Sequence, residues 1–308
     1  MRAKILFLAE KEKYRESLRM AQQALSELAV AFSHSFVMRE VSLEADANRK
    51  DLLLLVQEQD AVLIAGSREF AKEAALSIGC FAAFSRMNQT IAFQELSRLK
   101  EGIPPSADLI FPLNDNPSYI SKAAVTACAF AKKGGNHLIT VQNNETEGWN
   151  SVLSKAAMYA ALPSPQSYQL DTVLEHLFYN KEHRPLIMSD ANEASVIGHL
   201  LLFLGGTELL AHMTYLADSL RIQGVSPYSE QPQLPLFSML YATADAVRYS
   251  LGLEEEAGCL ETAINNVLAS GWRTPEFGIG QKTVAQEEAL RLIVQQVQLA
   301  GELFERFQ

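Results

Sequence analysis

The chain has 308 residues, of which 48% are hydrophobic, and a formal net charge of −10. This length and apolar content suffice for one large or two medium domains with their own cores. The acidic balance argues against a nucleic-acid partner, because phosphate binding needs clustered Lys and Arg. Cys80, Cys128 and Cys259 are dispersed and form no CxxC pair, so neither a disulfide framework nor a zinc knuckle is predicted.

A membrane segment is not expected. The apolar run at 200–204 is too short to cross a bilayer, and the first nine residues lead into charged residues rather than into a signal peptide. We therefore expect a cytoplasmic protein with no membrane partner.

Short apolar runs alternate with segments of helical periodicity, which is typical of an α/β fold. Lys4–Ala9 predicts a first strand and Glu12–Leu28 a first helix. The run that starts at Ala61 is continuously apolar and ends at Gly66, as a buried parallel strand does. Further strands are predicted at 36–41, 107–112, 137–141 and 185–189, and further helices at 51–59, 121–133 and 156–161.

The stretch Met239–Glu276 combines two helical segments. They meet at Gly252, which suits the position after a helix C-terminus, and Glu254–Glu256 then stand at the positive end of the second helix. Apolar residues recur in this second helix at spacings of three and four, and Gly271 closes it.

This stretch also resembles a known family. The sequences RYSLGLEEEA (248–257) and AINNVLASGWRT (263–274) are similar to the C-terminal part of the isopropylmalate/isocitrate dehydrogenases, which are β-decarboxylating, metal-dependent and NAD(P)-linked enzymes. The resemblance implies an isopropylmalate dehydrogenase-like α/β fold with two discontinuous α/β domains around a central cleft. Residues 1–90 plus 212–308 would form the large domain on the cofactor side, and 91–211 the smaller domain.

The resemblance also implies that the helix Ser195–Leu210 lies at a dimer interface. This segment contains nine Leu, Ile, Val or Phe residues, and a helix that is apolar on every side is buried in a core or between subunits. Gly198 and Gly205 would let two helices approach closely. We therefore predict a homodimer, and we interpret His199 as a core or interface histidine.

The cofactor motifs of the family are altered. Its glycine-rich loop is replaced by AEKEKYRE (9–16), which has no glycine, although close approach of the backbone to a dinucleotide favours residues without a Cβ atom. Its adenosine-binding loop should occupy 224–237, where a proline-rich sequence lacks the family's histidine and aspartate. Thr274 and Glu276 match family positions near the cofactor, and both also suit plain roles as turn and cap residues.

The catalytic motifs are altered as well. Ser85 stands in the place of a substrate-binding arginine, and Arg86, one residue later, would face the other side of a strand unless a bulge intervenes. Tyr119 is the nearest candidate for the family's catalytic tyrosine. Asn144 stands in the place of the catalytic lysine, and an amide cannot replace an ammonium as acid or base.

The metal ligands are only partly retained. Asp171 matches an aspartate that reaches the metal of the partner subunit in the family. The two remaining aspartates fall on Ser195 and His199 in the ungapped alignment. An alignment with one insertion keeps an acidic pair, Asp190 and Glu193, and hard cations such as Mg²⁺ or Mn²⁺ prefer oxygen ligands of this kind.

The apolar positions that build the family's core are thus kept, whereas most positions that would contact substrate, metal or nucleotide are changed. This pattern predicts a non-catalytic relative with a structural, regulatory or ligand-binding role and no cofactor, which could also pair with a catalytic homologue. The alternative is a divergent NAD(P)- and metal-dependent oxidoreductase for a 2-hydroxy acid such as a 3-isopropylmalate-like substrate, using Arg86, Asp171, Asp190 and Glu193. A further alternative is an enzyme of another class, for which Tyr119, His137 and Asp171 would be the candidate catalytic residues. No known catalytic motif in the sequence supports it.

Overall fold

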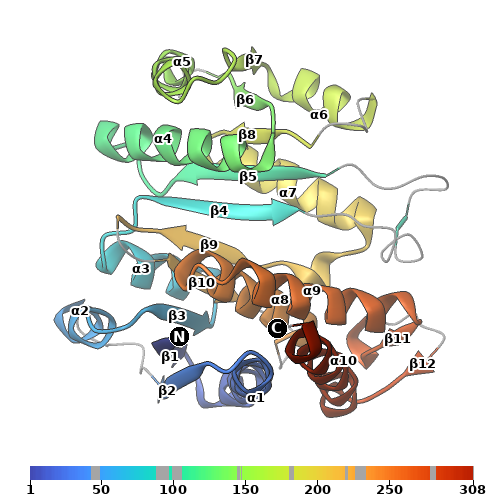
Figure 1. Ribbon diagram of the computed structural model, residues 1–308. Helices are drawn as coiled ribbons and strands as arrows, with labels where there is room; N and C mark the ends of the chain where they lie inside the picture. Colours follow the sequence, from blue (N-terminus) through green and yellow to red (C-terminus); the bar gives the residue numbers. More distant parts are fainter. Residues whose placement is uncertain are drawn as a thin grey trace. The chain divides into compact units, whose positions relative to one another are not determined.

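The computed structural model describes residues 1–42, 49–87, 97–98, 106–143, 146, 148–179, 184–218, 221–225, 234–277 and 282–307. The chain divides into two compact units: Met1–Gly79 with Leu209–Gln308, and Cys80–Glu208. Both are α/β units, in which helices pack on a sheet (Figure 1). The first break follows Gly79 rather than residue 90, because the strand at Ala82–Met87 pairs with the strand at Ala107–Pro112.

The first unit is built on strands in the order β2-β1-β3-β10-β9. β9 is antiparallel to β10, and the other pairs are parallel. Continuous apolar sequence explains the buried strands, since β3 has a parallel neighbour on each side and all five of its residues are buried. The strands are β1 (Arg2–Ala9), β2 (Ser35–Ser42), β3 (Ala61–Ala65), β9 (Met213–Leu216) and β10 (Arg221–Val225).

The helical segments of this unit come from its N-terminal and its C-terminal part. The N-terminal ones are η1 (Glu12–Tyr14), α1 (Arg15–Ala31), α2 (Arg49–Val56) and α3 (Arg68–Ser77). The C-terminal ones are α8 (Leu236–Asp245), the π-helical turn η4 (Ala246–Ser250), α9 (Glu254–Ala269), η5 (Pro275–Phe277) and α10 (Gln286–Phe307). A small pair of strands, β11 (Trp272–Arg273) and β12 (Lys282–Thr283), stands apart from the main sheet.

The second unit has strands in the order β4-β5-β8-β6-β7, with β4 antiparallel to β5 and the rest parallel. Its strands are β4 (Ala82–Met87), β5 (Ala107–Pro112), β6 (Leu138–Val141), β7 (Gln166–Tyr168) and β8 (Leu186–Met188). Its helices are α4 (Pro117–Gly134), α5 (Trp149–Tyr159), α6 (Leu170–Tyr179) and α7 (Ala191–Gly205), and the turn η3 (Glu208–Leu210) follows.

Two helices cover opposite faces of β4. The ring of Phe84 lies 4.7 Å from that of Phe130 on α4. A Cβ atom on Gly198 of α7 would lie 3.2 Å from the Cε atom of Met87. Successive side chains of a strand point to opposite faces, so Phe84 and Arg86 share the α4 side while Ser85 and Met87 share the α7 side.

Most predicted strands and helices are present, with shifted ends. Gly252 (φ 70°) and Gly271 (φ 82°) have left-handed backbone at the ends of their helical segments, as predicted. The strands β9 and β10 were not predicted, and Gly224 belongs to β10 rather than to a loop. Residues 226–233 of the predicted loop, and Asn144, lie outside the described residues.

The predicted helix Ser195–Leu210 is wrong at both ends. α7 begins at Ala191 because Asp190 caps it, its side chain accepting hydrogen bonds from two backbone N–H groups. It ends at Gly205, because Gly206 has φ 65°.

The exposure of α7 also corrects the prediction for His199. Ile197 and Leu201 are buried, whereas Val196 is 49% and Phe203 51% exposed. His199 is exposed, and its Nδ1 atom lies 2.7 Å from the backbone oxygen of Ser195. The interpretation of His199 as a core histidine is therefore wrong for the single chain.

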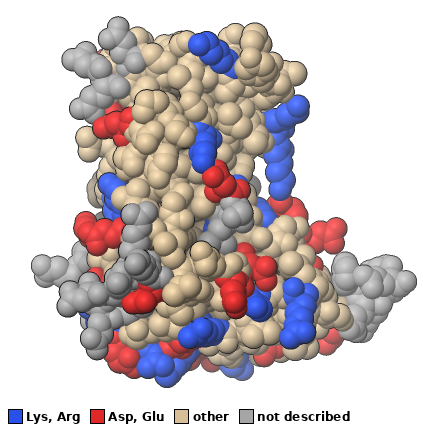
Figure 2. Space-filling view, turned by 90° about the vertical axis from the view of Figure 1, so that its left-hand side faces the viewer, with Lys and Arg blue, Asp and Glu red and all other residues tan. Residues whose placement is uncertain are grey.

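The surface carries charged side chains of both signs. On the face drawn in Figure 2, acidic and basic side chains are interspersed rather than gathered into a broad basic patch. No helix within the described ranges is long and apolar enough to span a membrane.

Candidate functional site

The carboxyl ends of parallel strands are the usual ligand-binding edge of an α/β sheet. In the second unit, Asn143 follows β6 and Asp190 follows β8, and these two strands are neighbours. The fold therefore brings their side chains together, with Glu193 on the first turn of α7.

A single amide nitrogen joins the two carboxylates. The Nδ2 atom of Asn143 donates to Oδ2 of Asp190 at 2.6 Å and to Oε1 of Glu193 at 2.7 Å. The other oxygen of Asp190 accepts from the N–H groups of Asn192 and Glu193 at 2.7 and 2.9 Å. Asp190 thus both caps α7 and holds the amide, and it is only 9% exposed.

Thr146 fixes the orientation of this amide. Its N–H donates to Oδ1 of Asn143 at 2.8 Å, and its hydroxyl oxygen accepts from the N–H of Asn143 at 2.8 Å. The Thr146 hydroxyl donates in turn to the backbone oxygen of Val141 at 2.8 Å. Because Oδ1 is already engaged, the NH₂ group is the part that faces the carboxylates.

This arrangement does not fit a divalent cation. A hard cation would need the oxygens Oδ2 of Asp190 and Oε1 of Glu193, and both already accept a proton of the Asn143 amide. The described residues contain no group of three or more His, Cys, Asp or Glu side chains that could hold a metal ion. One oxygen of each acid therefore already accepts from an internal neutral donor.

The corresponding edge of the first unit is also filled by a side chain. Glu10 follows β1, and its carboxylate accepts from the N–H of Ser67 at 2.6 Å and from its hydroxyl at 3.0 Å. Ser67 caps α3, where its hydroxyl oxygen accepts from the N–H of Phe70 at 3.2 Å. A carboxylate thus already occupies the positive end of α3, where a phosphate would otherwise be favoured.

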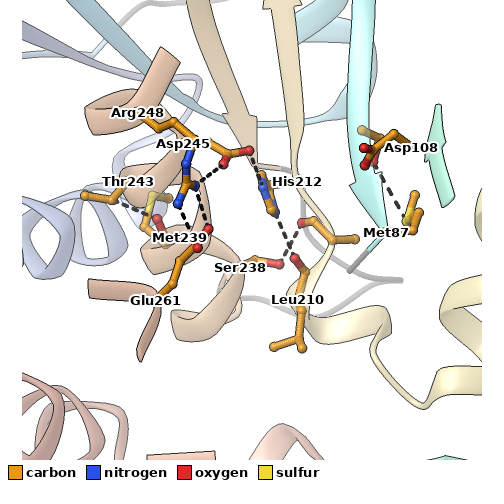
Figure 3. Close-up of polar contacts among 12 residues, drawn as sticks. Met87, Asp108, Leu210, His212, Ser238, Met239, Thr243, Asp245, Arg248 and Glu261 are labelled. Atoms are coloured by element: carbon orange, nitrogen blue, oxygen red, sulfur yellow. Dashed lines mark hydrogen bonds and ion pairs between the residues drawn. The ribbon is translucent and has the colours of Figure 1, made fainter. Parts of the chain in front are cut away.

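A buried polar network lies where α8 ends and α9 begins (Figure 3). Nε2 of His212 lies 2.9 Å from Oδ2 of Asp245, and Nδ1 lies 3.0 Å from the backbone oxygen of Leu210. Arg248 donates to both carboxylate oxygens of Glu261 at 2.7 and 2.8 Å. It lies 3.4 Å from Asp245 as well.

The π-helical turn η4 directs Arg248 into this network. The side chains of Asp245 and Arg248 are 1% and 6% exposed. Such buried charges are tolerated because they are paired and hydrogen-bonded. These contacts join α8, η4 and α9. We therefore interpret the network as structural support for the first unit.

The predicted site residues are only partly brought together. Asp190 and Glu193 meet at Asn143, whose part in this cluster sequence reasoning missed. Asp171 lies in the first turn of α6, where it is exposed and its Oδ1 accepts from Thr172 N–H at 2.7 Å. Tyr119 is half-buried in the first turn of α4.

Arg86 does not take the place of Ser85. The ladder between β4 and β5 runs without a bulge from Ala82 to Met87, so Arg86 faces the opposite side of the strand from Ser85.

The two predicted cofactor residues differ in their surroundings. Thr274 is 1% exposed, and its hydroxyl has no hydrogen-bond partner within the described part of the chain. Glu276 lies in η5 and accepts from Nε2 of Gln286 at 2.8 Å. Comparison with known proteins adds no assignment, since neither a protein-family model nor a curated protein matches the chain.

Proposed function

We propose that this chain is a non-catalytic relative of the isopropylmalate/isocitrate dehydrogenases with a structural, regulatory or ligand-binding role. The observation that carries the proposal is the Asn143 amide, which donates to Asp190 and Glu193 at 2.6 and 2.7 Å. In the one acidic pair that the resemblance could assign to a metal, one oxygen of each acid is then already engaged by a neutral group. An amide supplies neither the charge of a cation nor a proton-transfer group.

The filled edge of the first unit supports the same proposal. The carboxylate of Glu10 lies against Ser67 at the start of α3, and a dinucleotide phosphate brought there would meet a like charge. The loop 9–16 contains no glycine. We therefore propose a cytoplasmic protein that needs no NAD(P), Mg²⁺ or Mn²⁺.

A second candidate function is that the chain retains the dehydrogenase activity of the family it resembles. Asp190 and Glu193 lie close enough to share one donor, and a rotation of Asn143 away from them would free two carboxylate oxygens. A divergent NAD(P)- and metal-dependent oxidoreductase acting on a 2-hydroxy acid would need that rotation.

A dehydrogenase assay separates the two candidates. The full chain is incubated with 3-isopropylmalate or isocitrate, NAD⁺ or NADP⁺, and Mg²⁺ or Mn²⁺, and formation of reduced cofactor is followed by absorbance. The proposal predicts no enzyme-dependent rate and no saturable NAD⁺ binding tighter than about millimolar, roughly −4 kcal/mol. Turnover that Asp190→Asn abolishes would establish the second candidate instead.

The dimer belongs to this proposal too. The exposed side of α7 carries Val196, His199 and Phe203, which recur at spacings of three and four. The sequence between Glu193 and Glu208 contains no charged residue, and the Arg98 guanidinium that lies 4.1 Å from the Phe203 ring is paired with Glu208. We propose an isologous contact through this stripe.

A further inference from the structure

A cavity of about 400 Å³ lies within the first unit. It is formed by α1, the start of α8, η5 and the start of α10. This volume falls in the range of pockets that hold small molecules. The cavity has no part in the strand-edge clusters described above.

The wall of the cavity is largely apolar. Met20 contributes from α1, Leu234 and Pro235 from the entry to α8, and Pro275 from η5. Met20, Leu234 and Pro235 are buried. An apolar wall of this kind favours a ligand with a hydrocarbon or aromatic body.

The charged groups of the wall are all acidic. Among the described residues that line the cavity, Glu16, Glu276 and Glu287 are the charged ones, and none is Lys, Arg or His. Glu16 is exposed and hydrogen-bonds to Arg19 at 3.4 Å. Glu276 is held by the Nε2 atom of Gln286 at 2.8 Å, which leaves a carboxylate fixed at the wall.

The start of α10 would by itself favour an anion, since the N-terminus of a helix is its positive end. Glu287 and Glu288 stand in that first turn and offset the dipole. A phosphate or carboxylate ligand is therefore disfavoured in the cavity.

A serine hydroxyl also lines the wall of the cavity. Ser17 is 2% exposed and lines the cavity. Within the described part of the chain its hydroxyl makes no hydrogen bond, unlike Ser26 in the same helix, which donates to the backbone oxygen of Gln22 at 2.9 Å. This hydroxyl can therefore hydrogen-bond to a polar group of a ligand in the cavity.

We propose that this cavity binds a small organic cation, a primary ammonium carried on an apolar body. The ammonium has three N–H donors, and the wall offers the Glu276 carboxylate, the Ser17 hydroxyl and the side-chain oxygen of Gln286 as acceptors. The apolar body lies against Met20, Leu234 and Pro235. This inference rests on neither the family resemblance nor the loss of catalysis.

Two probes of equal length and opposite charge test the proposal. Hexylammonium and hexanoate are titrated into the full chain by calorimetry at fixed ionic strength. We expect saturable binding of hexylammonium and affinity at least tenfold lower for hexanoate. Equal binding of the two probes, or no binding of hexylammonium, overturns the proposal.

Substitutions then locate the site. Glu276→Gln removes the fixed charge with little change in shape and should weaken hexylammonium binding about tenfold or more, since hydrogen bonds to charged groups are the strong ones. Ser17→Ala should weaken it by a smaller factor, and it keeps the test valid if Glu276→Gln fails to fold. Glu255→Gln, the same charge change at an exposed position of α9, should bind as the unmodified protein does. Unchanged affinity in both Glu276→Gln and Ser17→Ala, or displacement of hexylammonium by NAD⁺, contradicts the assignment.

Discussion

The amide nitrogen of Asn143 lies 2.6 Å from Oδ2 of Asp190, at the carboxyl edge of two neighbouring strands. This contact places a neutral donor against a carboxylate that is 9% exposed. The same nitrogen also donates to Oε1 of Glu193, so one neutral group contacts both acids. In the proposed relationship to metal-dependent dehydrogenases, Asn143 would do structurally what a cation does in an active relative.

Replacing Asn143 with Asp would put a third carboxylate in this cluster. We expect Asn143→Asp to lower the free energy of unfolding by about 3 kcal/mol in EDTA, because an unpaired charge would be buried. We also expect Mg²⁺ or Mn²⁺ to restore part of the loss, because three carboxylates suit a hard cation. Thermal unfolding with and without the metal measures both effects.

Asn192→Asp is the matched control for this change. Asn192 is exposed in the first turn of α7, where a carboxylate is tolerated. The control should show no metal-dependent shift in unfolding temperature. A variant Asn143→Asp that is as stable in EDTA as the unmodified chain would contradict the role given to the amide.

The second prediction concerns the stability that the ion pair of Arg248 and Glu261 contributes. Arg248→Met leaves Asp245 and Glu261 without their cation, and breaking a buried pair on one side costs about 3–5 kcal/mol. Urea unfolding should show this loss, and Glu261→Gln combined with Arg248→Met should show less than the sum of the single losses. Arg291→Met, which removes an exposed pair with Glu288, should leave the urea midpoint nearly unchanged. Equal effects of Arg248→Met and Arg291→Met would refute the account of the network.

The sequence predicts much of this frame for clear reasons. Ala61–Ala65 is continuously apolar because β3 is buried by neighbours on both sides. Gly252 and Gly271 mark helix ends because both have positive φ. β9 and β10 were missed because they are short and include buried polar residues such as Thr214 and Gln223.

A pH dependence follows from Cys259. Burial, with a smaller contribution from the charge of Glu256, raises the pKa of Cys259 to about 11 from a usual value of 9.0. A thiol with a raised pKa favours folding fully below the unfolded value, and this contribution is lost as the pH rises through the folded value. The urea midpoint should therefore fall between pH 9 and 11, and it should fall less in Cys259→Ala. Identical pH profiles for the two proteins would exclude this cause.

The exposed stripe of α7 predicts the behaviour of the dimer. Val196→Glu places a charge on this stripe, at a side chain already 49% exposed, and should convert a dimer into a 34.0 kDa monomer without unfolding it. Leu201 is unsuitable for this test because it is fully buried in the single chain. Light scattering after size exclusion measures the mass, with Val125→Glu on the exposed side of α4 as control. A monomeric unmodified protein at micromolar concentration ends the dimer proposal.

The candidate site is less predictable from sequence than the frame. Counting along the chain put Asn144 in the lysine position, whereas the side chain that meets the acids is Asn143. A shift of one residue cannot be settled by an alignment, because the backbone after a strand decides which side chain turns inward. The spacing of Asn143 and Thr146 was the available local signal, since Asn side chains often bond to backbone N–H groups nearby.

Titration of Mn²⁺ into the unmodified chain by calorimetry tests the central claim most directly, because the metal is needed for the chemistry of the dehydrogenases that the sequence resembles. The account predicts no saturable heat at micromolar to low millimolar Mn²⁺, with or without 3-isopropylmalate, since Asn143 already occupies the two acceptor oxygens. Stoichiometric Mn²⁺ binding that disappears in both Asp190→Asn and Glu193→Gln would contradict it.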